Sequence, residues 1–515
     1  MRTSVIDTLR ATSLRHGARS AIETADEAVT YETLARAAFA LRTALLERFA
    51  RRGRPVAILA KKSPAAIAAI GATLMSGNVY CPLDVGAPPA RVRKILDGLG
   101  DCLVLADEAG MKLLATLGID CIDCTDGIQV MPLAWPDAAA LPVLPLVALW
   151  DQVALALEEG IDLDPCYIIF TSGSTGMPKG VTIAHRGVLD YIDWANGVYR
   201  VGPEDKVGSQ APLFFDNSTL DLYLCWSNGA CFHIIADKVF AFPKTIVDYL
   251  ARHAITTIFW VPSVLANIAN LALLDGAALP ALRRILFAGE VMPARTLKYW
   301  MARHPDALYS NLYGPTEITV DCTYYLVPPG WDGEVVPIGV PCRNSGVLVL
   351  DADDRAADEG ELCVRGSGVA LGYWNDPGKT EAAFVRNPLR PEVPETIYRT
   401  GDIVRRQDGL LYFVGRKDQQ IKHNGYRIEL GEIEAVAGAI GAVEACVAGY
   451  DAQGRQIWLA VKAADAGIDR AGLLKHLAAG LPKYMLPAKI EILSALPYTA
   501  NGKFDRQALA RLLCG

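Results

Sequence analysis

The sequence lacks any apolar run long enough to cross a bilayer, and it lacks the basic start and apolar segment of an export signal. It also has no block of basic charge, because its 50 Lys and Arg are interspersed with 57 Asp and Glu, for a net charge of −7. Proteins that bind nucleic acid usually gather basic residues on one face. These absences predict a cytoplasmic protein that binds neither membrane nor nucleic acid.

Cysteine is present but not in the paired, closely spaced patterns of disulfide or zinc frameworks. The 12 cysteines are scattered through a long chain without an export signal, so we expect reduced thiols. Cys121 and Cys124 form a lone CxxC with no second pair beside it. Burial as small apolar side chains is therefore favoured over a metal site.

Length and patterning predict more than one domain and an α/β fold. A chain of 515 residues exceeds what one core usually holds, and 51% hydrophobic residues can fill a large interior. Helical patterns at 30–50 and 63–77 flank a strand-like run at 55–60, an alternation typical of parallel sheets covered by helices.

The sequence pattern changes further along the chain. Residues 335–414 contain short strand-like runs separated by Gly, Pro and Asp, which predicts a β-rich subdomain. From residue 418 onward strand and helix patterns mix again, as in a small α+β domain. We therefore expect a large N-terminal domain over 1–417 and a small C-terminal domain over 418–515.

An apolar run at 166–170 leads directly into the stretch TSGSTGMPKG at 171–180. Glycines allow backbone N–H groups to turn toward an anion, and hydroxyls and a lysine add donors and positive charge. The spacing GxxxxGK[ST] of common nucleotide-binding loops is missing, and Pro178 precedes the lysine. On this stretch alone, a phosphate cradle and an ordinary loop both remain open. The candidate phosphate loop comprises Thr171, Ser172, Gly173, Ser174, Thr175, Gly176 and Lys179.

Five segments in a fixed order strengthen the phosphate interpretation: TSGSTGMPKG, NLYGPTE, YRTGD, GRKDQQIKHNGYRIE and TANGKFDR. Together they resemble the adenylate-forming enzymes, which include acyl-CoA synthetases, luciferases and the adenylation domains of nonribosomal peptide synthesis. The resemblance extends from about residue 30 to residue 506. It implies a large α/β domain with a β-rich subdomain, a small mobile C-terminal lid, and ATP and Mg²⁺ as cofactors.

Other segments narrow the resemblance to free-standing amino-acid adenylating ligases such as the D-alanine:carrier-protein ligases. These segments are QAPLFFDNSTLDLY, LFAGEVMP and LPKYMLPAKIEILSALPYTANGK. In this family a carboxylate attacks the α-phosphate of ATP to give an acyl adenylate and pyrophosphate. Because two anions must meet, positive charge at the reacting atoms is the main lever available to the protein.

The resemblance assigns roles to residues at matching positions. Lys503 matches the catalytic lysine that reaches from the lid; for an isolated NGK, a lysine in a solvated turn is the alternative. Glu317 is expected to hold Mg²⁺, since a carboxylate is a hard oxygen ligand. Asp418 matches the hinge between the two domains. Rotation about it would exchange Lys503 for a face carrying Lys422 and Gly425 near an incoming thiol.

The nucleotide contacts are implied in the same way. Tyr313 is expected against the adenine, Thr316 on the α-phosphate, and Asp402 and Arg416 at the ribose hydroxyls. A turn aspartate and a surface arginine are the alternatives for the last two. The remaining residues implied at the ATP site are Gly289, Glu290, Asn311, Leu312, Gly314, Pro315 and Tyr412.

Asp216 matches the aspartate that pairs with the α-ammonium group of an amino acid. A carboxylate beside PLFF is costly to bury unless a cation joins it, which favours an amino acid over a fatty acid. Capping of a following helix is the alternative. The family pattern places these residues in the substrate pocket wall: Asn217, Leu220, Phe259, Leu286, Ala288, Leu312, Val320 and Asp321.

Bulky apolar residues in this wall predict a substrate with a small side chain. The chain departs from the D-alanine ligases, in which a cysteine is expected at Ala288 and a small apolar residue at Asp321. A second carboxylate would suit a hydroxyl or an amine, so serine or a short diamino acid competes with alanine. Alternatively, Asp321 points away into a backbone hydrogen bond.

No attachment motif for phosphopantetheine is found after Lys503, so we expect the acceptor to be a separate carrier protein. The resemblance thus implies activation of a small amino acid and its transfer to that carrier. Two alternatives remain. One is an acyl- or aryl-CoA synthetase whose acid has no α-amino group, and the other is a catalytically silent nucleotide-binding or scaffold protein.

Overall fold

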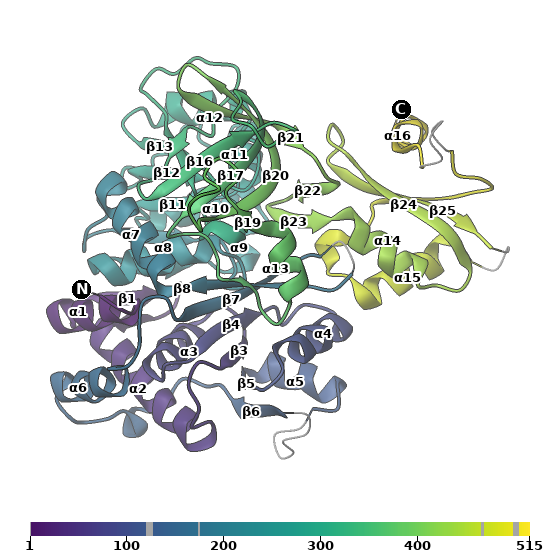
Figure 1. Ribbon diagram of the computed structural model, residues 1–515. Coiled ribbons are helices and arrows are strands. Elements are labelled where there is room, and N and C mark those ends of the chain that lie inside the picture. The colour runs from purple at the N-terminus through teal and green to yellow at the C-terminus, as the bar shows by residue number, and fades with distance from the viewer. Residues whose placement is uncertain (1, 120–126, 174–175, 465–467, 498–503, 515) are drawn as a thin grey trace.

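The computed structural model describes residues 2–119, 127–173, 176–464, 468–497 and 504–514 (Figure 1). Its large domain contains two large sheets with helices on their faces. The seven-stranded sheet has the order β18-β8-β7-β4-β3-β5-β6. Strands β7, β4, β3, β5 and β6 are parallel, whereas β8 and β18 are antiparallel additions at one edge. The strands are β3 (Pro55–Leu59), β4 (Val79–Leu83), β5 (Cys102–Ala106), β6 (Ile128–Pro132), β7 (Pro165–Thr171), β8 (Lys179–Ala184) and β18 (Gly372–Tyr373).

The nine-stranded sheet has the order β15-β14-β13-β12-β11-β9-β10-β1-β2. Its six central strands, from β13 to β1, are parallel, and the strands at both edges are antiparallel. The strands are β1 (Ser20–Glu23), β2 (Ala28–Thr30), β9 (Lys206–Ser209), β10 (Cys231–Ile234), β11 (Thr257–Trp260), β12 (Arg284–Phe287), β13 (Leu308–Tyr313), β14 (Thr323–Leu326) and β15 (Val340–Pro341). The central strands are almost fully buried, as expected for parallel strands covered on both faces.

The predicted helices at the start of the chain are confirmed as α2 (Tyr31–Arg48) and α3 (Pro64–Met75). Each begins at a hydroxyl cap, because Thr30 accepts from the amide of Thr33 and Ser63 from that of Ala66. The other helices of the large domain are α1 (Ile6–His16), α4 (Pro89–Leu99), α5 (Glu108–Thr116), α6 (Leu146–Ala156), α7 (His185–Tyr199), α8 (Asn217–Asn228), α9 (Asp237–Phe240), α10 (Pro243–Arg252), α11 (Pro262–Asn270), α12 (Ala294–Arg303) and α13 (Pro377–Ala383).

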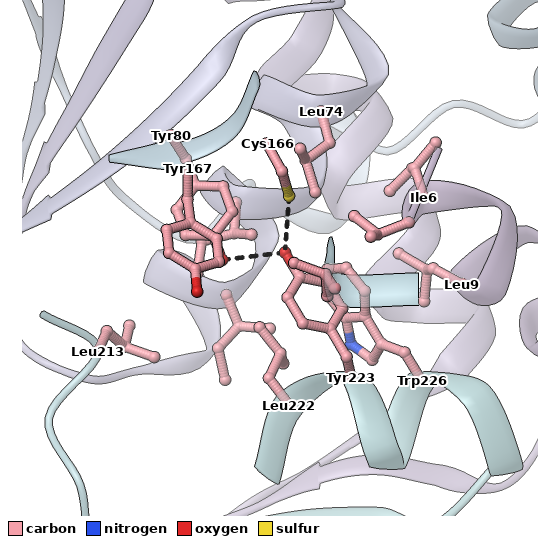
Figure 2. Close-up of a cluster of buried hydrophobic side chains, with 14 of the residues drawn as sticks. Ile6, Leu9, Leu74, Tyr80, Cys166, Tyr167, Leu213, Leu222, Tyr223 and Trp226 are labelled. Atoms are coloured by element: carbon pink, nitrogen blue, oxygen red, sulfur yellow. Dashed lines mark hydrogen bonds between the residues drawn. The ribbon is translucent and has the colours of Figure 1, made fainter. Parts of the chain in front are cut away.

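One buried apolar cluster includes side chains of both sheets and of the helices α1, α3 and α8 (Figure 2). In its centre the hydroxyl of Tyr223 donates to that of Tyr80 at 3.0 Å and lies 3.8 Å from the Cys166 sulfur. The phenols thereby satisfy their polar atoms inside an apolar interior. The two sheets are consequently joined through one core.

The β-rich subdomain predicted at 335–414 is confirmed as an antiparallel sheet followed by the small C-terminal unit. Its strands are β16 (Ser345–Leu350), β17 (Glu359–Gly366), β19 (Phe384–Arg386), β20 (Thr396–Gln407) and β21 (Leu410–Arg416). The C-terminal unit, which we call the lid, follows from residue 418 and lies on one side of the large domain (Figure 1). It contains the hairpin β22 (Gln420–His423) and β23 (Tyr426–Glu429), the sheet of β24 (Val443–Asp451), β25 (Gln456–Ala463) and β26 (Lys489–Leu493), and the helices α14 (Leu430–Gly438), α15 (Arg470–Gly480) and α16 (Arg506–Cys514).

Two further features concern the predictions made from composition. Among the described residues, ten cysteines are free thiols and all but Cys446 and Cys514 are buried; Cys121 and Cys124 lie outside the described residues. In the described part of the chain, no helix is both long enough and apolar enough to span a membrane.

Candidate active site

A cavity lies where the lid hairpin meets the ends of strands from the large domain. Its walls come from the loop after β7, the start of α8, the segments after β12 and β13, and the hairpin β22–β23. Such positions beyond the carboxyl ends of parallel strands are the usual ligand sites of α/β folds. The cavity volume is only about 90 Å³, below the roughly 300–1,000 Å³ typical of ligand pockets. The lid residues Lys422 and Arg427 line this narrow space.

The described part of the candidate phosphate loop directs polar groups toward the lid. The Thr171 hydroxyl is buried and has no hydrogen-bond partner in the described part of the protein. The Ser172 hydroxyl donates to the Arg427 carbonyl at 2.9 Å. Gly173 must be glycine, because a Cβ there would lie 2.1 Å from the Met177 carbonyl oxygen. Gly176 has a φ of +74°. Ser174 and Thr175 lie outside the described residues.

Two carboxylates of the lid contact this loop at the positions where it could bind an anionic ligand. The Gly173 amide donates to Glu432 Oε2 at 3.3 Å, and Glu432 is also paired with the buried Arg91 of α4. Lys179 Nζ lies 3.9 Å from Glu429 Oε1. Burial lowers the pKa of Lys179, and the neighbouring Arg427 lowers it further. In this pose, the lid supplies negative charge to the loop.

Glu317 is fully buried, and both of its carboxylate oxygens are engaged. Arg427 Nη1 lies 2.6 Å from Oε2, and the Tyr373 hydroxyl donates to Oε1 at 2.9 Å. Burial raises the pKa of Glu317, but the charges of Arg427 and Lys179 outweigh it and lower the value to about 2. Glu317 is therefore an anion whose cation comes from the lid.

The chemistry of Glu317 would fit Mg²⁺ only if Arg427 were withdrawn from its carboxylate. No group of three or more metal-binding side chains is found among the described residues, so the protein would supply few ligands. Mg²⁺ is commonly held by one or two carboxylates together with phosphate oxygens and water. If Arg427 withdrew, Glu317 Oε2 would be free to serve as that carboxylate.

The predicted adenine and ribose residues form one connected network. The Tyr313 hydroxyl donates to Asp402, which also pairs with Arg416. Arg416 in turn binds both oxygens of Asp418, at 2.6 and 2.7 Å. Lys422 Nζ lies 5.5 Å from the centre of the Tyr313 ring, and burial lowers its pKa. The structure thus brings these five residues together at the start of the lid.

Asp216 lies half-buried in the cavity wall. It occupies the N-cap position of α8, but its side chain makes no capping hydrogen bond, so the capping alternative is wrong. Burial raises its pKa, opposed by the Thr316 hydroxyl and the charge of Lys422. No ion pair to Asp216 is found in the described part of the chain, so its carboxylate suits a cationic group of a ligand.

Only part of the predicted pocket wall reaches the cavity. Asn217, Ala288, Val320 and Asp321 line it beside Asp216. The other predicted wall residues belong to the buried apolar cluster behind it and are absent from the lining: Leu220, Phe259, Leu286 and Leu312.

Asp321 is 3% exposed, and its Oδ2 accepts a hydrogen bond from the Tyr191 hydroxyl at 2.6 Å. The alternative of a side chain turned into a backbone bond is therefore wrong. Burial and the nearby Asp216 raise the pKa of Asp321 to about 8, although Tyr191 and Lys422 act in the opposite direction. The adjacent Val320 has a φ of +70°, a strained conformation for a β-branched residue.

The remaining predicted ATP-site residues divide into two groups. Gly289, Gly314, Pro315 and Thr316 line the cavity. Asn311 donates to the Pro337 carbonyl at 2.7 Å, and Tyr412 lies on β21 outside the lining.

Glu290 connects the large domain with the lid. Its carboxylate accepts from the amides of Ser263 and Gly425, both at 2.8 Å. Gly425, at a φ of +81°, forms the turn of the lid hairpin and packs against Val261. Lys503 lies outside the described residues, so its distance to Asp216 is not part of this geometry.

Several residues of the site were missed by reasoning from sequence. Arg427 could have been found, since it lies inside the GYRIE segment used for the resemblance. No sequence motif pointed to the other four residues, which are Tyr373, Arg91, Glu432 and Tyr191. They reach the site from β18, α4, α14 and α7, which only folding brings together.

Comparisons with known proteins identify the family of the chain. Residues 9–374 match the AMP-binding enzyme family, and residues 432–503 match the AMP-binding enzyme C-terminal domain. An L-proline–[L-prolyl-carrier protein] ligase of Streptomyces coelicolor is 35% identical over 98% of this chain and 96% of its own length. Tyrocidine synthase 3 of Brevibacillus parabrevis is 32% identical over 96% of this chain, which spans only 7% of that much longer protein.

A solved structure supports the fold. The Vibrio cholerae adenylation domain AlmE superposes with a TM-score of 0.83 at 23% identity, covering 99% of this chain and 98% of that one. The predicted α/β fold with a C-terminal lid is thereby confirmed. The chain belongs to the AMP-binding enzyme family of adenylate-forming ligases, as its ordered motifs predicted.

Proposed function

We propose that the protein activates a small amino acid, of alanine or serine type, as an aminoacyl adenylate with release of pyrophosphate. It then transfers the aminoacyl group to the phosphopantetheine thiol of a separate carrier protein. The full-length similarity to a ligase named for a prolyl-carrier protein supports an amino acid as substrate and a carrier protein as partner.

The observation that carries the proposal is the position of Asp216. Its carboxylate lines the same cavity as Thr316 and the phosphate loop, and no capping role accounts for it. An α-ammonium group bound there would place the carboxylate of the same substrate nearby, toward the phosphates. A fatty or aryl acid would bring no cation of its own to the half-buried Asp216.

ATP and Mg²⁺ complete the first half of the reaction. In our proposal the loop around Thr171 and Gly173 receives phosphates, and Tyr313 and Asp402 receive adenine and ribose. Mg²⁺ at Glu317 would neutralise phosphate charge. Lys503 would stabilise the negative charge that builds up where the two anions meet.

The contacts of the lid support a reaction in two poses. The lid binds three groups that a nucleoside triphosphate and its metal ion would need. Arg427 binds Glu317, Glu429 lies near Lys179, and Glu432 accepts from the Gly173 amide. The pose described here is thus better suited to the state after pyrophosphate has left. Rotation about Asp418 would bring Lys503 in for adenylation and return the hairpin for transfer.

Pyrophosphate exchange tests the proposal. Labelled pyrophosphate should enter ATP in the presence of small amino acids, when the common amino acids and both enantiomers are compared. Matched acids without the amine, such as propionate for alanine, serve as controls. Exchange driven by those acids and not by any amino acid would identify a CoA synthetase. Tight ATP binding without exchange for any acid would indicate a silent nucleotide-binding protein.

A further inference from the structure

Lys62, remote from the reacting groups, contacts one short segment of the chain through several oxygen atoms. It lies three residues beyond the end of β3, next to Ser63, the N-cap of α3. Its Nζ donates to the carbonyl oxygens of Ser209 and Ala211 at 2.9 and 3.0 Å. The Gln210 carbonyl and the Ser209 hydroxyl lie slightly further away, each at 3.3 Å. All three N–H bonds of the ammonium group can be used on this segment.

These contacts join the two large sheets. Ser209 is the last residue of β9 in the nine-stranded sheet, whereas Lys62 follows β3 of the seven-stranded sheet. A hydrated surface lysine would gain little by ordering its long side chain in this way. The position of Lys62 therefore requires a further reason.

A buried carboxylate supplies part of that reason. Asp221, in the second turn of α8, is 1% exposed, and neither of its oxygens has a hydrogen-bond partner among the described residues. Burial raises the pKa of Asp221 to about 7, opposed by the charge of Lys62 and by the nearby Ser209 hydroxyl. Burial likewise lowers the pKa of Lys62 to about 8, opposed by Asp221 and Asp237. The charge of Lys62 offsets part of the cost of burying Asp221.

The segment between Ser209 and Asp221 carries Asp216. Segment 209–216 leads from the last residue of β9 to the N-cap of α8, and within it the Phe215 amide donates to the Pro212 carbonyl at 3.0 Å. Leu213 of this segment extends into the buried cluster drawn in Figure 2 and is 6% exposed. Lys62 thus holds the start of the segment by hydrogen bonds, and its charge acts on Asp221 in the following helix.

We propose that Lys62 is a positioning residue for Asp216: it fixes the segment 209–216 so that this carboxylate meets the α-ammonium group of the substrate. Lys62 does not line the cavity, so its effect passes through the segment. The inference rests on the proposed function for the identity of the ligand. It predicts a defect in amino-acid recognition that leaves ATP recognition intact.

The test compares Lys62→Met and Lys62→Arg with Lys61→Met. Lys61 is the adjacent, exposed lysine, and its side chain has no partner in the described structure. In pyrophosphate exchange, Lys62→Met should raise the KM for the amino acid at least tenfold while the KM for ATP stays within twofold. Lys62→Arg, which can still donate to several carbonyls, should recover most of the loss. Equal changes in both KM values, or none, would overturn the proposal.

Two further measurements keep the test decisive. If Lys62→Met does not fold, Asp221→Asn takes its place, and wild-type KM values for both substrates in that variant would count against the proposal. Hydrogen exchange over residues 211–219 reads the order of the segment without any activity. It should be faster in Lys62→Met than in wild type and in Lys61→Met, and unchanged exchange would refute the positioning role. If the wild-type protein showed no amino-acid-dependent pyrophosphate exchange, the proposed function would be refuted instead. The hydrogen-exchange measurement would still test the positioning role of Lys62.

Discussion

Replacing Arg427 by methionine should separate the two half-reactions. Methionine keeps much of the length of the side chain but removes the cation that lies 2.6 Å from Glu317 Oε2. Glu317 is fully buried, so in this pose of the lid its charge would then depend on Lys179 and on the Tyr373 hydroxyl. A buried charge that loses its partner is strongly destabilised. The variant should therefore disfavour this pose without changing the adenylation pose.

The size of the effect follows from the pKa of Glu317. Its fall from 4.5 to about 2 in spite of burial corresponds to about 3 kcal/mol of net favourable interaction. Arg427 and Lys179 share that interaction, so we assign about 2 kcal/mol to Arg427. Because about 1.4 kcal/mol is a factor of ten, this pose should become roughly 30-fold less populated. The stabilisation of this pose by the ionised Glu317 is fully present above pH 4.5 and is lost as the pH falls toward 2.

The assay measures both half-reactions in the same preparation. Pyrophosphate exchange reports adenylate formation, and single-turnover transfer to a phosphopantetheine thiol reports the second step. Arg427→Met should slow transfer about 30-fold and leave exchange within about twofold of wild type. Arg470→Met is the matched control, because Arg470 pairs with Glu491 inside the lid. If exchange slows as much as transfer, or transfer does not change, this pose does not serve the second step and the reasoning is wrong.

Three other predictions concern individual residues. Lys503→Ala should abolish adenylate formation while ATP binding, measured by calorimetry, weakens only mildly; near-normal turnover would reject its catalytic role. Asp216→Ala should reduce exchange with amino acids at least 100-fold, since an unpaired ammonium costs several kcal/mol, with ATP binding unchanged; undiminished amino-acid use would mean that the pocket has been misplaced. Asp321→Asn should flatten the pH dependence of the free energy of unfolding. The raised pKa of Asp321 adds stability below about pH 4, and this stability is lost as the pH rises to about 8. Denaturant titrations measure the free energy of unfolding; if it fell equally with pH in the variant and in wild type, the prediction would be wrong.

Much of the fold could be predicted from the sequence. The helices α2 and α3 follow from their apolar periodicity, which is a local property. The β-rich subdomain follows in the same way from its frequent turn residues. The order of the strands within the sheets could not be predicted, because pairing depends on contacts between segments far apart in the chain.

The candidate site was predicted where its residues lie in short ordered motifs, such as Tyr313, Thr316 and Asp402. It was not predicted where a lone side chain reaches the site from a separate element. The phenol of Tyr191 on Asp321 and the hydroxyl of Tyr373 on Glu317 are of this kind. Such residues have no pattern around them, since their role depends on position in space and not on sequence neighbours.

By itself the sequence determined the class of this protein, since glycines, hydroxyls and charged residues at fixed spacing suffice to identify an adenylate-forming ligase. Tertiary structure decided which charges meet. The pairing of Arg427 with Glu317, and the hold of Lys62 on the segment of Asp216, both join parts of the chain more than 100 residues apart. Burial gives these contacts their strength, because a charge removed from water must find a partner, and only the folded chain determines which partner is within reach.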